Sequence, residues 1–295
     1  MSLIHKSKSL AKMMLALLTQ PALRTAYLDM TDALYGQAET DQRLLTQWPP
    51  VLRGFRYAQA WRPAPVKDTS PSRLGVGSAP QPGRLRSYFD AHKEGRGIWK
   101  WNHYFEIYEQ YFSRFVGREV HVLEIGIYSG GSLEMWRDYF GPGCRVYGVD
   151  IQAACKAYEN EYTRIFIGDQ GSREFWRTVT RDVPRVDILI DDGGHEPEQQ
   201  IVTVEEMLPH IAAGGVYLCE DIHGIQHGFA SYVYGLVNNL NETQGSATDG
   251  VRTTPFQSWI KSIDFYPYVA VLQMAESPTP EFIGPKHGTQ WQPFL

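Results

Sequence analysis

Cysteine is scarce in this chain, and long apolar runs and internal repeats are missing. The 295 residues contain only Cys144, Cys155 and Cys219, an odd number without C-x-x-C spacing. This pattern excludes a disulfide framework and a cysteine zinc site, and it favours a reducing, cytoplasmic environment. No apolar run reaches the length of a membrane span, so we expect no membrane partner.

A surplus of positive charge is also missing. The formal net charge is −5, and no dense run of Lys and Arg occurs. A nucleic-acid partner held by phosphate neutralisation is therefore not expected. With 43% hydrophobic and 21% charged residues, the chain can bury the core of one large domain with an extension, or of two unequal domains.

The first part of the chain predicts an extension followed by a linker. Met13–Leu18 follows three lysines but is too short for a membrane span and lacks a small-residue cleavage site, which favours an amphipathic helix. We predict that residues 1–60 form a helical extension serving as a lid or as a dimer contact, and hence a homo-oligomer. Residues 61–86 are rich in Pro and Gly and predict a linker or surface loop, which leaves residues 87–295 as the main domain.

The stretch around residues 122–133 carries the first functional motif. An apolar run that contains Glu124 is followed by Gly126 and Gly130, and then by apolar residues at helical spacing over 133–140. This order predicts a strand, a tight loop and a helix. Glycines suit such a loop because backbone N–H groups can then approach a ligand without a Cβ atom in the way.

The following apolar runs indicate which ligand the loop binds. Residues 145–149 end at Asp150, 24 residues after Gly126, where an acid meets ribose hydroxyls in a doubly wound sheet. The glycine spacing differs from the G-x-G-x-x-G of dinucleotide-binding loops, and a carboxylate at Glu124 repels phosphate but suits a sulfonium or ammonium group. A third run, 164–167, precedes Gly168-Asp169-Gln170.

Strands and helices continue to alternate in the remaining chain. We expect strands at 187–190 and 215–219 and a helix at 201–210, with a turn at Gly214-Gly215. Residues 262–273 predict two further strands with a turn near Tyr266-Pro267. The sequence therefore predicts an α/β fold with a mostly parallel, doubly wound sheet.

Acidic residues follow two of these strands. Asp191-Asp192 ends the fourth strand and Glu220-Asp221 ends the fifth. The carboxyl ends of neighbouring parallel strands face one crevice, and converging carboxylates call for a hard divalent cation with oxygen ligands. We expect Mg²⁺ on Asp192, Glu220 and Asp221, and a structural or cofactor role for Asp191, although an exchange of Asp191 with Asp192 stays open. The alternative is that these acids cap the following helices.

The motifs together resemble a known group of enzymes. The order Leu-Glu-Ile-Gly-x-Tyr-x-Gly-Gly-Ser, Asp-Asp-Gly-Gly-His and Gly-Gly-Val-Tyr-x-x-Glu-Asp between Ile98 and His223 resembles the class I S-adenosylmethionine (SAM)-dependent methyltransferases. Within them it is similar to the metal-dependent sugar O-methyltransferases of macrolide and other natural-product pathways, which are related to the cephalosporin hydroxylase family. The resemblance implies a seven-stranded Rossmann-like sheet whose last strand inserts antiparallel, SAM and Mg²⁺ as cofactors, and residues 87–295 as the methyltransferase domain.

The resemblance also assigns site residues. It implies that Asp192, Glu220 and Asp221 bind magnesium, and that His195 is the catalytic base beside Asp192, with His223 and His227 as alternative bases. We expect Tyr104 and Lys100 to close over the cofactor. The residues expected to contact SAM are Glu124, Gly126, Tyr128, Ser129, Gly130, Ser132, Asp150, Ile151, Gly168, Asp169, Gln170, Asp191 and Tyr104.

Three functions are consistent with the sequence. The first is methylation of a sugar hydroxyl on a glycosylated small metabolite, the second is methylation of another vicinal oxygen pair such as a catechol, and the third is an accessory protein without transfer activity. The segment 228–256 is expected to be a loop and is a candidate lid over the acceptor.

Overall fold

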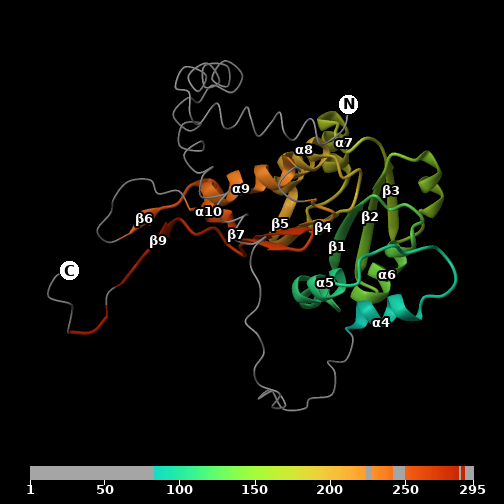
Figure 1. The fold of residues 1–295 in the computed structure, drawn as a ribbon, viewed down its shortest axis with the longest axis horizontal. Helices are drawn as coiled ribbons and strands as arrows, with labels where there is room; N and C mark the ends of the chain where they lie inside the picture. Colours follow the sequence, from blue (N-terminus) through green and yellow to red (C-terminus); the bar gives the residue numbers. More distant parts are fainter. Residues whose placement is uncertain (1–82, 224–227, 242–249, 286, 290–295) are drawn as a thin grey trace, which may run out of the picture. The chain divides into compact units, whose positions relative to one another are not determined.

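The computed structural model describes residues 83–223, 228–241, 250–285 and 287–289 (Figure 1). The predicted helical extension 1–60, most of the predicted linker and His227 lie outside the described residues. The first described helix, α4, spans Arg84–Ala91 and begins three residues before the predicted domain boundary. No helix within the described ranges is both long enough and apolar enough to cross a lipid bilayer.

A seven-stranded sheet forms the centre of the fold. Its strands follow the spatial order β3-β2-β1-β4-β5-β8-β7, and β8 alone runs opposite to the other strands of the sheet. The strands are β1 Val120–Ile125, β2 Cys144–Asp150, β3 Thr163–Ile167, β4 Val186–Asp191, β5 Ile211–Cys219, β7 Ile260–Tyr266 and β8 Val269–Met274. The predicted doubly wound, Rossmann-like sheet with an antiparallel last strand is confirmed, and the predicted turn lies at Pro267-Tyr268.

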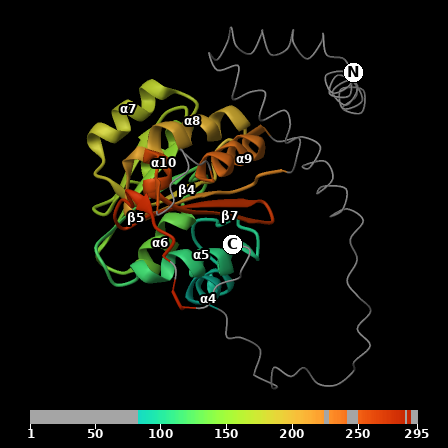
Figure 2. The ribbon, with the colours of Figure 1, turned by 90° about the vertical axis from the view of Figure 1, so that its left-hand side faces the viewer.

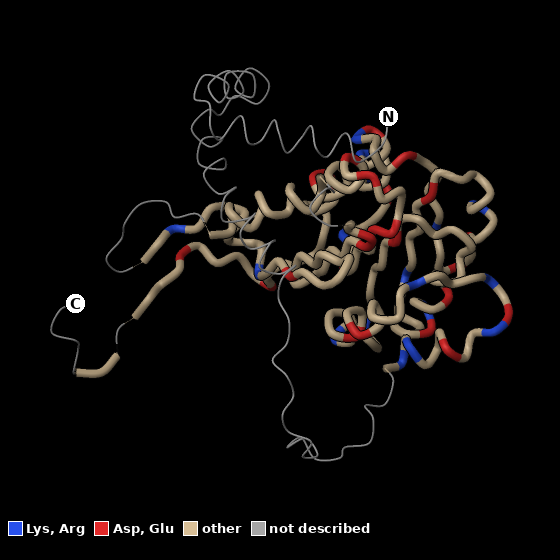
Figure 3. Tube along the Cα trace, viewed as in Figure 1, with Lys and Arg blue, Asp and Glu red and all other residues tan. Residues whose placement is uncertain are grey.

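Helices cover both faces of the sheet. Helices α4, α5 and α6 lie on one face, and α7, α8, α9 and α10 lie on the other (Figure 2). Their bounds are α5 Tyr104–Phe112, α6 Gly131–Phe140, α7 Arg173–Asp182, α8 Pro197–Met207, α9 Gly228–Leu240 and α10 Pro255–Trp259. A separate two-stranded antiparallel sheet pairs β6 Val251–Arg252 with β9 Glu281–Phe282. Lys and Arg are spread along the described chain and are not gathered on one element (Figure 3).

Alternating side chains of each central strand supply two separate cores. Ile188 and Ile190 of β4 belong to the core under α5 and α6, whereas Leu189 between them belongs to the core under α7, α8 and α9. In β5, Leu218 and Tyr217 divide in the same way. Because both faces are covered, the inner parts of β4 and β5 are continuously apolar and buried, as expected for a parallel sheet.

Two sequence predictions of local structure were wrong. The predicted loop 228–256 contains helix α9, in which Phe229 and Val233 are buried one helical turn apart and pack towards α8. The predicted turn Gly214-Gly215 lies inside β5, because an irregularity in the β4–β5 register absorbs these two residues within the strand. Gly214 has a φ of +72°, which glycine adopts at little cost.

Candidate active site

A cavity of about 750 Å³ opens at the carboxyl ends of the central strands. Such an edge of an open α/β sheet is the usual place for a ligand. Most of the predicted site residues line it, namely Tyr104, Gly126, Tyr128, Ser132, Asp150, Ile151, Gly168, Asp169, Gln170, Asp192, His195, Glu220, Asp221 and His223. Glu124, Ser129, Gly130 and Asp191 are absent from the lining.

The loop after β1 is held against the loop after β4. Gly126 has a φ of +78°, and a Cβ atom at this position would lie 1.9 Å from the carbonyl oxygen of Asp192. Only glycine fits here without moving one of the two loops. Gly130, with a φ of +77°, is the residue that precedes α6, so the two glycines allow the chain to turn from strand to helix within five residues.

The end of β2 lines the cavity next to the loop after β1. The Tyr128 amide donates to Asp150 Oδ2 at 3.1 Å, and the Gln152 amide donates to Asp150 Oδ1 at 2.8 Å. The side chains of Tyr128 and Ile151 are 72% and 64% exposed beside the carboxylate. A ligand here would meet a carboxylate next to two apolar surfaces, which suits a ring that carries hydroxyl groups.

Asp191 faces the protein interior, unlike its neighbour Asp192. Its carboxylate is fully buried and accepts hydrogen bonds from Gln170 Nε2 and from the Tyr217 hydroxyl, both at 3.0 Å. Burial raises the pKa of Asp191, while these hydrogen bonds work in the opposite direction. Between the two adjacent aspartates, Asp192 is the one placed to contact a ligand in the cavity.

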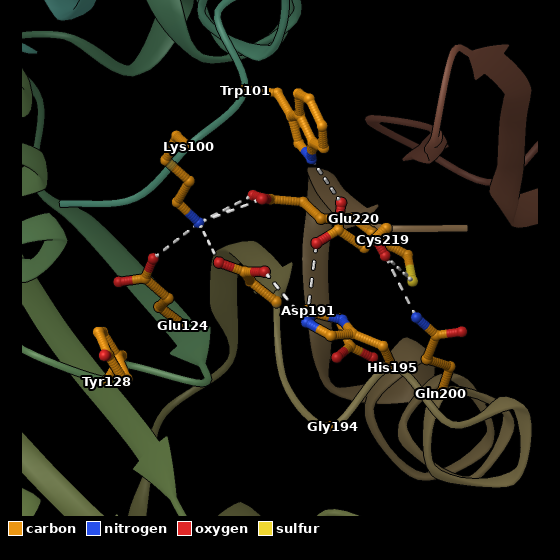
Figure 4. Close-up of polar contacts among 12 residues, drawn as sticks. Lys100, Trp101, Glu124, Tyr128, Asp191, Gly194, His195, Gln200, Cys219 and Glu220 are labelled. Carbon is orange, nitrogen blue, oxygen red and sulfur yellow. Dashed lines mark hydrogen bonds and ion pairs between the residues drawn. The ribbon is translucent and has the colours of Figure 1, made fainter. Parts of the chain in front are cut away.

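We call the four acids Glu124, Asp192, Glu220 and Asp221 the acidic cluster. The Lys100 ammonium group lies among its carboxylates (Figure 4). Its Nζ donates to Asp192 Oδ2 at 2.6 Å and to the Glu220 carboxylate at 3.1 and 3.2 Å, and it lies 3.4 Å from Glu124 Oε1. The Lys100 side chain is only 3% exposed. One ammonium group therefore links residues at the ends of β1, β4 and β5.

The buried charges shift one another's pKa values. Burial raises the pKa of Glu220, as does the nearby Asp192 carboxylate, while Lys100 and the Tyr108 hydroxyl, which donates to Glu220 at 2.5 Å, oppose the rise. For Lys100, burial disfavours the ammonium, but the carboxylates of Asp192 and Glu220 outweigh this effect and raise its pKa. Lys100 is therefore charged at neutral pH.

A second group of side chains surrounds His195. Its Nε2 lies 3.8 Å from Asp192 Oδ1 and 3.7 Å from Asp221 Oδ2. The three residues each offer one ligand atom within 4.8 Å of the others. The two carboxylate oxygens suit a hard divalent cation, and the histidine nitrogen can serve as ligand or as base. His195 and Asp221 both have a φ of +55°, an uncommon conformation that concentrates at functional sites.

The structure thus divides the predicted metal ligands. Asp192 and Asp221 converge beside His195, whereas the Glu220 carboxylate contacts Lys100 and Tyr108. Asp221 Oδ1 accepts from Trp101 Nε1 at 3.1 Å and from the Tyr104 hydroxyl at 2.7 Å. These donors orient Asp221 and leave Oδ2 turned towards His195.

Sequence reasoning missed the partners that hold these acids. Tyr108 was not among the predicted site residues, and Lys100 was predicted only to close over the cofactor. A lysine between two tryptophans, directly before an amphipathic helix rich in tyrosine, was the available signal. It gives no partner, because the contacts of Lys100 with Asp192 and Glu220 span 92 and 120 residues.

The part of the chain that carries these motifs is similar to known methyltransferases. Residues 123–222 match the family model described as a methyltransferase domain. The chain is 28% identical over 200 residues to an 8-demethyl-8-alpha-L-rhamnosyl tetracenomycin-C 2'-O-methyltransferase of Streptomyces olivaceus, with 61% of this chain and 52% of that protein covered. It is 31% identical over 185 residues to the demethylmacrocin O-methyltransferase of Streptomyces fradiae, with 60% and 45% covered.

A solved structure shows the same fold. The MycE methyltransferase from the mycinamycin pathway, in complex with Mg and SAH, superimposes with a TM-score of 0.53 at 24% identity, and the match covers 65% of this chain and 53% of that one. The chain spans about half the length of the curated relatives it matches. The predicted resemblance to the sugar O-methyltransferases is confirmed by these matches.

Proposed function

From the methyltransferase domain at residues 123–222, we propose that the chain is a SAM- and Mg²⁺-dependent O-methyltransferase. Its acceptor is a sugar hydroxyl of a glycosylated natural product or a related small metabolite. The observation that carries the proposal is that one cavity joins the glycine loop and Asp150 to the group of Asp192, His195 and Asp221. Donor and acceptor can therefore meet at one edge of the sheet.

The part of the cavity formed by the loop 126–130, Asp150 and Ile151 is proposed to bind SAM, and we call it the cofactor wall. Asp150 would accept from the ribose hydroxyls, Ile151 would cover the adenine, and the loop from Gly126 to Gly130 would surround the methionyl part. Glu124, Ser129, Gly130 and Asp191 would act indirectly, because they do not line the cavity. Ser132 lines the cavity and donates to Glu124 Oε2 at 2.7 Å, so it connects Glu124 to the cavity lining. The sulfonium methyl group is already activated, so the protein mainly aligns the acceptor oxygen with it.

Magnesium is proposed to bind through Asp192 and Asp221; Glu220 is the third proposed ligand and would have to exchange its contact with Lys100 for the ion. Bound magnesium would make an acceptor hydroxyl more acidic. His195 lies beside both aspartates and is the proposed base for the hydroxyl proton, with His223 as the alternative on the same cavity.

Support for a sugar acceptor comes from the relatives. Their names describe O-methyl transfer to glycosylated tetracenomycin and to demethylmacrocin. The alternatives are methylation of a catechol-like oxygen pair and an accessory role without transfer activity. A homo-oligomer, a cytoplasmic location and an extension at residues 1–60 that acts as a lid or dimer contact remain predictions.

A methyl-transfer assay tests the proposal. We expect transfer from labelled SAM to an aryl α-L-rhamnoside in the presence of Mg²⁺, its loss in EDTA, and its loss in His195→Ala. S-adenosylhomocysteine at about a hundred times its Kd should stabilise the wild type and His195→Ala alike by roughly 2.7 kcal/mol, a shift of several degrees in Tm. NAD serves as the comparison ligand.

The outcomes separate the parts of the proposal. Stabilisation by NAD and not by S-adenosylhomocysteine would overturn the cofactor. Transfer to a catechol but not to the rhamnoside would favour the first alternative, and cofactor binding without any transfer would favour the second. Turnover retained in His195→Ala would eliminate this residue as the base.

A further inference from the structure

Exposed aromatic side chains form one wall of the cavity at its far end from Asp150. Trp101 and His223 line the cavity, and Tyr268 packs against both, with ring centroids 5.9 Å from Trp101 and 5.5 Å from His223. Trp101 is 53% exposed and Tyr268 is 44% exposed. We call Trp101, His223 and Tyr268 the aromatic platform. Fixed aromatic rings with this much exposed surface beside a cavity are typical of a ligand-binding surface.

Three segments of the chain hold the platform in place. Trp101 Nε1 donates to Asp221 Oδ1, so the indole is fixed beside the acidic cluster (Figure 4). The Ile222 amide donates to the Tyr268 carbonyl at 3.0 Å, and His103 Nε2 donates to the Pro267 carbonyl at 3.0 Å. The β7–β8 turn is therefore tied both to the end of β5 and to the segment before α5.

Tyr268 occupies a position that favours glycine. It has a φ of +64° in the two-residue turn between β7 and β8, where glycine or asparagine is the usual choice. An aromatic residue in this conformation is a local conflict, and such conflicts concentrate where a side chain has a functional role. The rings of Trp101 and His223 lie against this side chain.

The platform lies apart from the proposed cofactor wall. Asp150 ends β2 and His223 follows β5, with β1 and β4 between these strands in the sheet. Three strand spacings correspond to about 14 Å. The platform instead borders Asp221, the carboxylate proposed to bind magnesium. A ligand at this end must present an apolar face to the rings and oxygen atoms to the acidic cluster.

We propose that the aromatic platform is the acceptor subsite, and that it binds the C–H face of the sugar ring. A pyranose has this double character, because its axial C–H bonds carry partial positive charge that the negative face of an aromatic ring attracts. Its vicinal hydroxyl groups point outwards from the ring edge towards Asp221. The inference rests on the proposed function and adds the residues that select the acceptor.

The test uses the full chain with 4-nitrophenyl α-L-rhamnopyranoside as the probe. Tyr268→Gly should raise the acceptor KM about threefold to tenfold, the usual loss for one aromatic contact, with the Kd of S-adenosylhomocysteine unchanged. Tyr268→Phe should keep the wild-type KM. Because glycine relieves the turn, the urea midpoint of Tyr268→Gly should be equal to or above that of the wild type. A purely structural role for Tyr268 predicts a lower midpoint.

Phe265→Ala is the matched control. Phe265 is an aromatic residue of the same hairpin and is 51% exposed, but the rings of Trp101 and His223 pack against Tyr268 and not against Phe265. Its removal should leave the acceptor KM unchanged. An unchanged KM in Tyr268→Gly, or an equal rise in Phe265→Ala, would overturn the platform.

Saturation-transfer NMR separates this inference from the proposed function, because it needs no turnover. Saturation should reach the ring C–H protons of the rhamnoside in the wild type and should weaken in Tyr268→Gly. If the wild type binds the rhamnoside in this way but does not methylate it, the platform stands and the proposed function fails. If the wild type methylates the rhamnoside and the acceptor KM does not depend on Tyr268, the proposed function stands and the platform fails. No rhamnoside binding by the wild type would overturn the platform.

Discussion

Lys100 places one buried positive charge among three carboxylates, those of Glu124, Asp192 and Glu220. Removing one partner of a buried ion pair leaves uncompensated charge in a medium of low dielectric constant. We expect Lys100→Met to lower the free energy of unfolding by about 3–5 kcal/mol at neutral pH. Urea denaturation measures this change.

Lys156→Met is the control for this prediction. Lys156 pairs with Glu159, but its side chain is 54% exposed, so solvent screens the interaction. The same substitution should therefore cost about 1 kcal/mol or less. Equal losses in the two variants would mean that Lys100 does not compensate the buried carboxylates.

The sequence predicted which acids lie at the site, but it did not predict the side chains that contact them. The strand-end argument placed Asp192 and Asp221 at one edge, and the structure brings them together with His195. It could not tell that Asp191 points inwards, because adjacent residues of a strand alternate and the register was unknown. The contacts of Lys100 were also hidden, because burial of a lysine depends on tertiary neighbours that the local pattern does not contain.

Gly126 decides the geometry of the loop that joins β1 to α6. A Cβ atom there would lie 1.9 Å from the Asp192 carbonyl oxygen, and its φ of +78° disfavours any other residue. We expect Gly126→Ala to destabilise the protein by more than the roughly 1–2 kcal/mol of the left-handed conformation alone. It should also weaken binding of S-adenosylhomocysteine, which calorimetry measures directly.

Gly117→Ala is the comparison that isolates the steric clash. Gly117 has a φ of +76°, but no atom lies within 4 Å of the Cβ position. Only the conformational cost of roughly 1–2 kcal/mol applies here, and cofactor affinity should not change. If both variants bind S-adenosylhomocysteine like the wild type, the close contact between the two loops is not needed for the site.

The elements near the site were predictable because their patterns are strong. Strands β1, β2 and β4 are apolar runs that end at a glycine or an aspartate, and the sequence therefore predicted them. Helix α9 did not, because its glycine and asparagine residues resemble a loop while only Phe229 and Val233 are buried. The extent of β5 depended on a register irregularity with β4, which arises between strands and leaves no local signal.

All three thiols of the molecule are free and buried. Burial raises the pKa of Cys144 to about 12, whereas in the unfolded chain a thiol ionises near its ordinary pKa of about 8.5. The folded protein therefore binds more protons than the unfolded chain above this pH, and the free energy of unfolding should fall as pH rises. The slope should be close to zero below about pH 8 and should approach about 1.4 kcal/mol per pH unit for each such thiol above about pH 9, which urea denaturation between about pH 7 and 10 measures.

Thiol labelling provides the independent check. A thiol-specific reagent should react slowly with the native protein at pH 8 and rapidly in urea, since the thiolate is the reactive form. The variant with Cys144, Cys155 and Cys219 replaced by alanine should show a smaller fall in stability with pH. A slope equal to that of the wild type would assign the alkaline loss to other groups.

The position of the antiparallel strand in the sheet was predicted from the resemblance to the methyltransferases and not from the residues alone. Alternating strands and helices predicted a parallel sheet, but the insertion of β8 between β5 and β7 followed only from the fold that the resemblance implied. The antiparallel β8 is buried at nearly every position, like the central parallel strands, so its residue pattern does not mark its direction.

Trp99, Lys100 and Trp101 alternate between exposed, buried and exposed side chains. Lys100 reaches the acidic cluster while Trp101 joins the cavity wall, and each position is fixed by the one beside it. Insertion or deletion of a single residue in this segment would exchange the two directions, with an indole entering the charged interior and an ammonium group facing solvent. Homologues that share this cavity should therefore keep the length of this segment unchanged.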